Sequence, residues 1–235
     1  MGHEFLYCWK TYRKSRKIEL YNVFAKHNIY SALYAFATGK VNDISAKTIK
    51  KGLSNYRPSG FRQNIYKSGK ITIYADCYNA VAKSVKSAID AADSIPTKGR
   101  RIAVLGDVAE AGLLTKSTHT EIVKIVNDSD FDALFSCSNE LKNAISNSRI
   151  RDTLSVYLYD SQNEMNRSLK RFVKNYDLIL FKSSHSGNLQ NSIKRVFPYA
   201  YCYQMLKYYI PRIIWHFKVI LGWGWYRLYR FWQNY

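Results

Sequence analysis

Residues 70 to 197 alternate short apolar runs with amphipathic stretches. Runs rich in β-forming residues predict strands at residues 71–76, 102–106, 133–137, 155–159 and 178–181. Apolar residues at helical spacing predict helices at residues 80–92, 115–126, 139–145, 162–173 and 188–196. Because the predicted strands are almost continuously apolar, both faces of their sheet should be buried. The region is therefore predicted to be an α/β fold, a Rossmann-like parallel sheet with flanking helices on both faces.

Residues 27 to 55 follow a different pattern, with two predicted helices and no strand between them. The helices are expected at residues 28–37 and 45–53. Ser45 is a suitable N-cap, and Gly52 falls near the end of the second helix. A helical hairpin of this kind is not part of the strand–helix alternation, so we expect it to belong to another domain.

The composition is typical of a folded protein from a reducing compartment. Hydrophobic residues make up 47% of the 235 residues, which is enough for a buried core. The four cysteines are far apart and form no C-x-x-C pair, which argues against a zinc ribbon or a disulfide framework. The first 17 residues lack the apolar segment of a signal peptide. We expect a cytoplasmic protein, with peripheral contact at the inner membrane face as an alternative.

The formal net charge of +19 requires an explanation. Nucleic acid, an anionic membrane or phosphate-bearing ligand, and a merely solvated basic surface all remain open. Short basic clusters such as Lys50–Lys51 and Arg100–Arg101 contribute to the charge. No zinc-finger or RNA-binding motif accompanies them, so nucleic acid is the least favoured partner.

The last segment, residues 199–235, is an aromatic and basic tail. It contains every tryptophan except Trp9, many tyrosines, and no acidic residue. His216 and Lys218 interrupt its apolar stretches, which are too short to span a bilayer. Such a composition is typical of segments at a membrane interface, where aromatic rings lie among the headgroups. A helical extension packed on the domain, or a contact with a partner, remains an alternative.

Four local patterns occur in order along the chain. They are Lys26–Leu33 (KHNIYSAL) with Gly52–Leu53 and Ser59–Gln63 (SGFRQ); Asp76–Ala80 (DCYNA); Val104–Gly112 (VLGDVAEAG) with His119; and Leu180–Ser184 (LFKSS). In order and spacing these patterns resemble the Mur ligases over residues 24–198. Among them the resemblance is closest to the members that act on UDP-muramoyl peptides and D-alanyl-D-alanine in peptidoglycan precursor synthesis.

The resemblance implies a domain order and a reaction. Mur ligases have an N-terminal domain for the UDP-sugar, a central P-loop ATPase, and a C-terminal Rossmann-like domain. They use ATP and Mg²⁺ to activate a carboxylate as an acyl phosphate, which an amine attacks to form an amide. Here residues 1–23 would be a basic N-terminal segment, 24–58 a helical remnant of the central domain, 60–198 the C-terminal domain, and 199–235 the tail.

The resemblance also implies a nucleotide site. Its residues are Asn28, Arg62, Asp76, Tyr78 and Asn79. Arg62 and Asp76 would contact the ribose or base, and Asn28 the adenine side. Ligands of open α/β sheets bind at the carboxyl ends of strands, where Asp76 falls. From the sequence alone, Asp76 could equally be the N-cap of the next helix, and Asn28 simply the start of a helix.

Lys182 and Ser184 are the implied substrate-binding residues, near a D-alanyl-D-alanine site. An ammonium and a hydroxyl suit a carboxylate or phosphate, although Lys182 could also be an ordinary surface lysine. Glu110 and His119 resemble acid–base residues, but residues of these types more often cap a helix or bond a loop. No catalytic residue is therefore assigned, since positioning and charge neutralisation dominate phosphoryl transfer.

Several departures from the family pattern bear on activity. The chain has no G-x-x-x-x-G-K-[ST] motif, so it lacks a phosphate cradle and the associated Mg²⁺ site. Val81–Ser84 replaces the usual Asn-Pro-Asp-Ser, Ser31 replaces a second Asn, and Ser183–His185 replaces Gly-Ser-Arg. We therefore expect a Mur-type ligase that is incomplete without a P-loop ATPase subunit or domain. The alternative is a catalytically silent binding domain that acts as a partner subunit or at the membrane surface.

Overall fold

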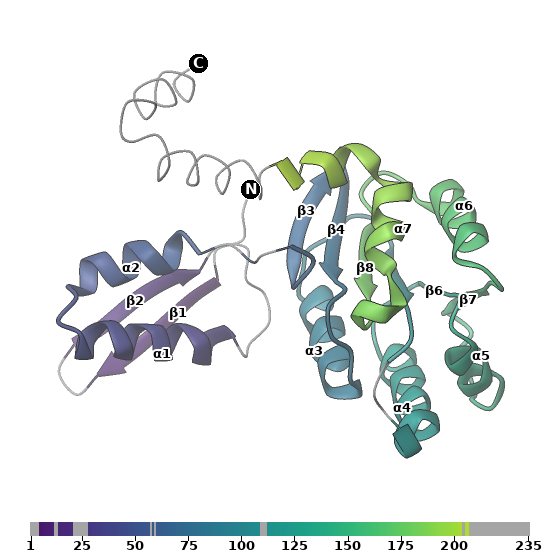
Figure 1. Ribbon diagram of the computed structural model, residues 1–235, viewed down its shortest axis with the longest axis horizontal. Helices are drawn as coiled ribbons and strands as arrows, with labels where there is room; N and C mark the ends of the chain where they lie inside the picture. Colours follow the sequence, from purple (N-terminus) through teal and green to yellow (C-terminus); the bar gives the residue numbers. More distant parts are fainter. Residues whose placement is uncertain are drawn as a thin grey trace.

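The computed structural model describes residues 5–11, 14–20, 28–56, 58, 60–108, 112–203 and 205–206. These residues form a small N-terminal unit followed by a larger α/β unit, shown in Figure 1. Most of the predicted tail and Glu110 lie outside the described residues. Among the described residues, no helix has both the length and the apolar character needed to cross a membrane.

The larger unit contains a six-stranded sheet in the order β3-β4-β8-β5-β6-β7. Its strands are β3 (Asn64–Ser68), β4 (Ile71–Asp76), β5 (Arg101–Leu105), β6 (Ala133–Ser136), β7 (Ser155–Leu158) and β8 (Leu178–Lys182). Strands β4 to β8 are parallel, and β3 pairs antiparallel with β4. The predicted parallel sheet is confirmed, and β3 adds an antiparallel edge strand that the sequence analysis missed.

Helices cover both faces of this sheet, as predicted. On one face lie α3 (Ala82–Asp93), α4 (Thr115–Asn127) and α5 (Asn139–Ser146), and on the other α6 (Gln162–Phe172) and α7 (Leu189–Val196). Alternate residues of each strand enter the two cores; Leu180 packs with the first group of helices and Phe181 with the second. Both side chains are fully buried, which contributes about 1.5 to 3 kcal/mol each. The two short 3₁₀ turns are Gly112–Leu114 and His185–Gly187.

The position of β8 creates the crevices at which a ligand can bind. The chain leaves β4 through α3, builds β5, β6 and β7 outward, and returns through α6 to insert β8 between β4 and β5. Strand β8 then leads to α7 on one face, whereas β4 and β5 lead to α3 and α4 on the other. Crevices at the carboxyl ends of an α/β sheet open where neighbouring connections diverge in this way. Asp76 and Lys182 are register partners at one such point.

The N-terminal unit combines the predicted helical hairpin with a β-hairpin that was not predicted. Strands β1 (Phe5–Thr11) and β2 (Lys14–Leu20) pair antiparallel, and they are followed by α1 (Asn28–Val41) and α2 (Ala46–Ser54). Ile18, Phe36 and Ile49 form the centre of its small core. The Ser45 side chain accepts from the Thr48 N–H, which confirms the predicted N-cap.

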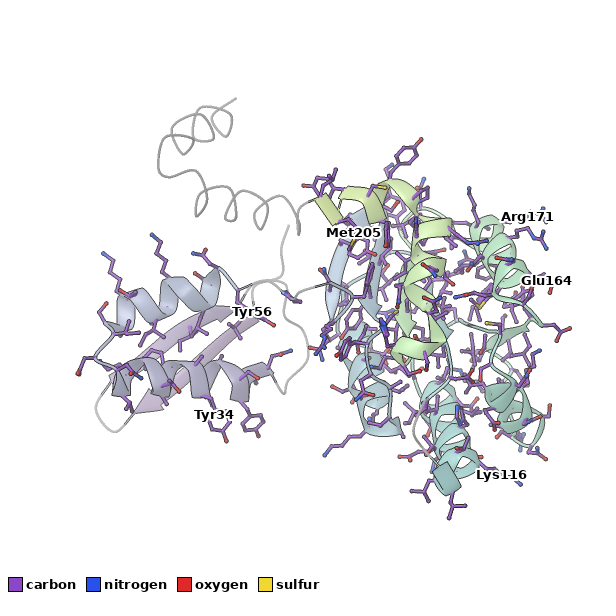
Figure 2. The ribbon with its side chains drawn as sticks, viewed as in Figure 1. Tyr34, Tyr56, Lys116, Glu164, Arg171 and Met205 are labelled. Carbon is purple, nitrogen blue, oxygen red and sulfur yellow. The ribbon has the colours of Figure 1, made fainter. Side chains whose placement is uncertain are left out.

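Helix α1 is apolar on the side that faces away from this core as well. Tyr30, Tyr34 and Val41 are 67%, 74% and 83% exposed. In Figure 2, Tyr34 points away from the rest of the unit. Although Ser31, Thr38 and Lys40 are exposed as well, these large apolar side chains give the outer side of α1 the character of a contact surface.

Candidate functional site

A cavity of about 330 Å³ lies at the carboxyl ends of β4 and β8. It is lined by Asn28, Tyr56, Pro58, Arg62, Gln63, Asp76, Tyr78, Asn79, Ser84 and Lys182. All five predicted nucleotide-binding residues and Lys182 are among them. The cavity thus takes residues from both units of the described chain, since Asn28 begins α1 while Asp76 ends β4.

A buried ion pair forms the polar centre of the cavity. The Lys182 ammonium lies 2.8 Å from Asp76 Oδ2, and the two side chains are 2% and 11% exposed. Lys182 also donates to the Asn79 carbonyl, which fixes the loop after β4. Lys182 is therefore no surface lysine, and that alternative is wrong. Removing one member of such a pair leaves an uncompensated buried charge, which typically costs 3 to 5 kcal/mol, an order-of-magnitude figure.

Gln63 connects the two units at this site. Its backbone N–H donates to Asp76 Oδ1 over 3.2 Å, and its side-chain oxygen accepts from Asn28 Nδ2 over 2.9 Å. Asp76 is thus engaged on both oxygens. Helix α3 begins only at Ala82, with Val81 as its N-cap, so the interpretation of Asp76 as an N-cap is wrong. Asn28 does begin a helix, and it also faces the cavity.

Arg62 and Tyr78 form a flat wall of the cavity. The guanidinium carbon lies 3.0 Å from the centroid of the Tyr78 ring, a stacked cation–π arrangement. The Tyr78 ring also lies beside His185, with centroids 6.1 Å apart. A planar guanidinium stacked on a half-exposed aromatic ring offers both a stacking surface and hydrogen-bond donors.

The start of α3 forms a further part of the lining, through Ser84. Its hydroxyl accepts from the Val81 N–H and donates to the Val81 carbonyl, each over 3.0 Å. Sequence reasoning assigned no role to Ser84, Gln63, Tyr56 or Pro58. Gln63 was part of a motif that was recognised and Ser84 of a segment that departs from the family pattern, but nothing in the sequence singled out Tyr56 or Pro58.

Ser184 does not line the cavity. It is buried, its hydroxyl donates to the Asp107 carbonyl over 2.9 Å, and it shares a hydrogen bond with Ser186. Ser138 in turn hydrogen-bonds the Asp107 carboxylate. These groups form a second polar cluster, between the ends of β5 and β8. The structure therefore brings Lys182 together with the predicted nucleotide site rather than with Ser184.

His119 is a loop-bonding residue. It is 1% exposed; its Nδ1 donates to the Thr115 carbonyl over 2.7 Å, and its Nε2 accepts from the Val108 N–H over 3.4 Å. One ring nitrogen thus bonds the helix on which His119 lies and the other bonds the loop after β5, in agreement with the alternative considered from the sequence. Glu110, the other acid–base candidate, lies outside the described residues.

The chemistry of the cavity suits an uncharged, hydroxyl-bearing and planar group. Among the described residues, no group of three or more His, Cys, Asp or Glu side chains could hold a metal ion. Asp76 offers carboxylate lone pairs to hydroxyl groups, and Arg62 on Tyr78 offers a stacking surface. The described residues thus fit the ribose and base of a nucleotide, and they do not fit Mg²⁺.

Cys77 lies directly behind the ion pair. Burial, together with the neighbouring Asp76 carboxylate, raises the pKa of its thiol to about 12, although Lys182 opposes the shift. The thiol donates to the Phe181 carbonyl of β8. Cys77 is therefore a packing residue at this site and not a nucleophile.

Comparison with known proteins supports this fold and identifies its family. The family described as "Mur ligase, glutamate ligase domain" matches residues 62–185. The chain is 29% identical over 175 residues to the UDP-N-acetylmuramoyl-tripeptide–D-alanyl-D-alanine ligase of Bacillus subtilis, covering 73% of this chain and 38% of the relative. It is 24% identical over 165 residues to the ligase of the same name from Treponema pallidum, covering 70% and 36%.

Solved structures show the same architecture. The MurF ligase of Thermotoga maritima in complex with ADP superimposes with a TM-score of 0.67 at 17% identity, covering 87% of this chain and 44% of that chain. A crystal structure of MurF from Acinetobacter baumannii gives 0.71 at 17% identity, covering 83% and 43%. The chain thus spans less than half the length of the relatives that it matches. Its matched residues cover more than half of its own length, and the chain belongs to the Mur ligase family.

Proposed function

We propose that this chain provides the ribose- and base-binding part of an ATP-dependent amide ligase of peptidoglycan precursor synthesis. The observation that carries the proposal is the cavity, where Asn28, Arg62, Asp76, Tyr78 and Asn79 meet around the Asp76–Lys182 pair. The relatives named as UDP-N-acetylmuramoyl-tripeptide–D-alanyl-D-alanine ligases support the reaction class, and the ADP complex of the Thermotoga maritima MurF ligase supports the nucleotide.

In this proposal the phosphates and Mg²⁺ are held by a P-loop ATPase part that this chain does not contain. The absence of a G-x-x-x-x-G-K-[ST] motif supports a division of this kind. In this division, residues 24–58 belong with the central ATPase part, 60–198 form the C-terminal domain, and 199–235 follow it. The β-hairpin within residues 1–23 shares a core with α1 and α2, so it goes with the central part. The substrates would be a UDP-muramoyl peptide and D-alanyl-D-alanine.

The outer side of α1 is the surface at which the ATPase part would dock. Tyr30, Tyr34 and Val41 are large apolar side chains that are exposed on this side of the helix. Asn28, at the start of the same helix, lines the cavity. A partner on α1 would therefore lie next to the nucleotide and could present its phosphate-binding loop to it.

Ligand binding by the full chain tests the nucleotide site directly. Adenosine, ADP and ATP should bind with dissociation constants within a few-fold of one another, because the lining residues suit the nucleoside and offer no phosphate cradle. Asp76→Asn, which keeps an acceptor for the Gln63 N–H but removes the charge, should weaken adenosine binding about tenfold to a hundredfold. Isothermal titration calorimetry measures both effects.

The matched control is Asp90→Asn. Asp90 is an exposed acid of α3, paired with Lys86, away from the cavity. Its substitution should leave adenosine binding unchanged. If ATP bound far more tightly than adenosine, or if Asp90→Asn weakened binding as much as Asp76→Asn, the proposed site would be wrong.

A silent binding domain is the second candidate, and one observation favours it. The Lys182 ammonium and the Ser184 hydroxyl are both engaged within the protein, with Asp76, the Asn79 carbonyl and the Asp107 carbonyl. Neither group is then aimed at the carboxylate of a second substrate. Such a domain would bind adenosine as above but would support no amide formation with any ATPase partner.

A further inference from the structure

The outward side of the α6–α7 pair is strongly basic. Six exposed cations lie on these helices and on the turn after α6: Arg167, Lys170, Arg171, Lys174, Lys194 and Arg195, here called the basic face. Within the part of the chain that the structure describes, none of them is in an ion pair with an acid. Arg195 is hydrogen-bonded to Asn163, and Lys194 lies 5.9 Å from the Tyr201 ring. Glu164, in the first turn of α6, is the acid on these two helices.

Exposed aromatic residues follow the basic face directly. Helical turns continue over residues 198–203, and there Tyr199 and Tyr203 are 90% and 64% exposed. In Figure 2, Arg171 and Met205 lie toward one end of the α/β unit, while Lys116 lies at the other. The end of α6 and the segment after α7 thus lie toward the same end of the α/β unit.

The sequence continues the same composition. After Asp177 the chain contains no further Asp or Glu, whereas residues 207–235 include Lys207, Arg212, Lys218, Arg227 and Arg230. Four of the five tryptophans of the chain also fall in this stretch. At the amino ends of the strands, Asp93 ends α3, Asp128 and Asp130 follow α4, and Asp132, Asp152 and Asp177 precede β6, β7 and β8. Asp177, which is nearest to Lys174 in sequence, is buried and paired with Arg100.

We propose that the basic face, with Tyr199 and Tyr203, docks the protein on an anionic lipid bilayer. Its cations complement the charged headgroups, and tyrosine and tryptophan rings are favoured at headgroup depth. Nucleic acid could satisfy the charge alone, whereas the exposed tyrosines beside the cations favour a bilayer. The proposal is independent of the proposed ligase function, since none of its residues lines the nucleotide cavity.

Docking by this face leaves the nucleotide site accessible. The cavity lies at the carboxyl ends of β4 and β8, whereas α6 and α7 run back toward the amino ends of the strands. Figure 1 shows α7 and the turn after it leading to that opposite end. A bilayer at the basic face would therefore not cover the cavity.

Vesicle co-sedimentation of the full chain tests the proposal. The protein should bind vesicles of phosphatidylcholine with 30% phosphatidylglycerol and should bind pure phosphatidylcholine vesicles at least about tenfold more weakly, with the difference reduced at high salt. Lys170→Glu with Arg171→Glu should weaken binding to the anionic vesicles by about tenfold or more. Tyr199→Ala with Tyr203→Ala should also weaken it, by a few-fold.

The control has the same change of charge on the opposite face of the domain: Lys116→Glu with Lys124→Glu, both exposed residues of α4. This variant should keep nearly the full affinity. An equal loss in both charge variants, or no loss in Lys170→Glu/Arg171→Glu while its thermal unfolding stays normal, would overturn the proposal. Tight RNA binding without vesicle binding would overturn it in favour of nucleic acid.

Discussion

Burial beside the Asp76–Lys182 pair explains why the neighbouring cysteine should be inert. Cys77 is fully enclosed and its thiol pKa is raised to about 12, so almost no thiolate is present at neutral pH. Cys202, by contrast, is exposed. These differences arise from the local packing and not from the residue type.

We expect iodoacetamide at pH 8 to modify Cys202 within minutes and to leave Cys77 unmodified in the native protein. Cys77 should react only after the protein is unfolded in denaturant. Peptide mass spectrometry after quenching distinguishes the two sites. Modification of native Cys77 at a rate like that of Cys202 would contradict the buried position of its side chain.

Single residues show how far sequence could predict the site. Asp76 and Lys182 could be identified because acids and lysines at strand ends are conspicuous and lie in recognisable motifs. The ion pair between them could not be predicted, since it forms only because β8 lies beside β4 in the sheet. The role of Gln63 was equally hidden, because its backbone N–H rather than its side chain contacts Asp76.

Among the secondary-structure elements, the loops that precede β5 and β8 approach each other closely at Gly99. This contact allows a test of the packing between the two loops. A Cβ added at Gly99 would lie 2.6 to 2.7 Å from backbone atoms of Tyr176 and Asp177. Asp177 also stabilises the contact between the two loops, because its carboxylate accepts from the Arg100 N–H and pairs with the Arg100 guanidinium. Backbone atoms cannot move aside as a flexible side chain can.

Gly99→Ala should therefore lower the free energy of unfolding by about 1 to 3 kcal/mol, the usual cost of overpacking. Gly52→Ala is the matched control. Gly52 lies in α2, where an added Cβ meets nothing within 4 Å, so this change should be neutral or stabilising by up to about 1 kcal/mol. Urea unfolding followed by circular dichroism measures both, and a harmless Gly99→Ala would contradict the packing.

The elements themselves were predicted where the pattern was long and periodic. The predicted strands and helices of residues 71–196 all exist, with ends within a few residues of those expected. The hairpin strand β3 was missed because its NIYKS sequence is half polar, although Gly69 with φ +58° marks the tight turn to β4. β2 was missed because basic residues dominate its first half (KSRKIEL), and β1 because its apolar run FLYCW is short and does not alternate.

For the molecule as a whole, the central question is whether the chain can act alone. We expect no phosphate release from ATP by the purified chain with Mg²⁺, UDP-N-acetylmuramoyl-tripeptide and D-alanyl-D-alanine. A phosphate-release assay should become positive only with a P-loop ATPase partner, and Asp76→Asn should reduce that signal at least about tenfold. Release by the chain alone would show that it has a phosphate site of its own.

The order of strands in the sheet could not be read from the sequence. The strand–helix alternation predicts parallel neighbours, but it does not say that the last strand returns to the centre. That return determines where the cavity forms, because it places Lys182 opposite Asp76. The resemblance to a known family supplied the site residues, whereas only the fold shows why they meet.

The central place of β8 also has a consequence for how the protein is made. On the ribosome, β4, β5, β6 and β7 all emerge before β8, yet β4 and β5 have no direct pairing with each other. The nascent chain therefore carries two open strand edges until Leu178–Lys182 is released. Translation that paused before this point would expose those edges to other chains, so the synthesis of β8 would favour folding over aggregation.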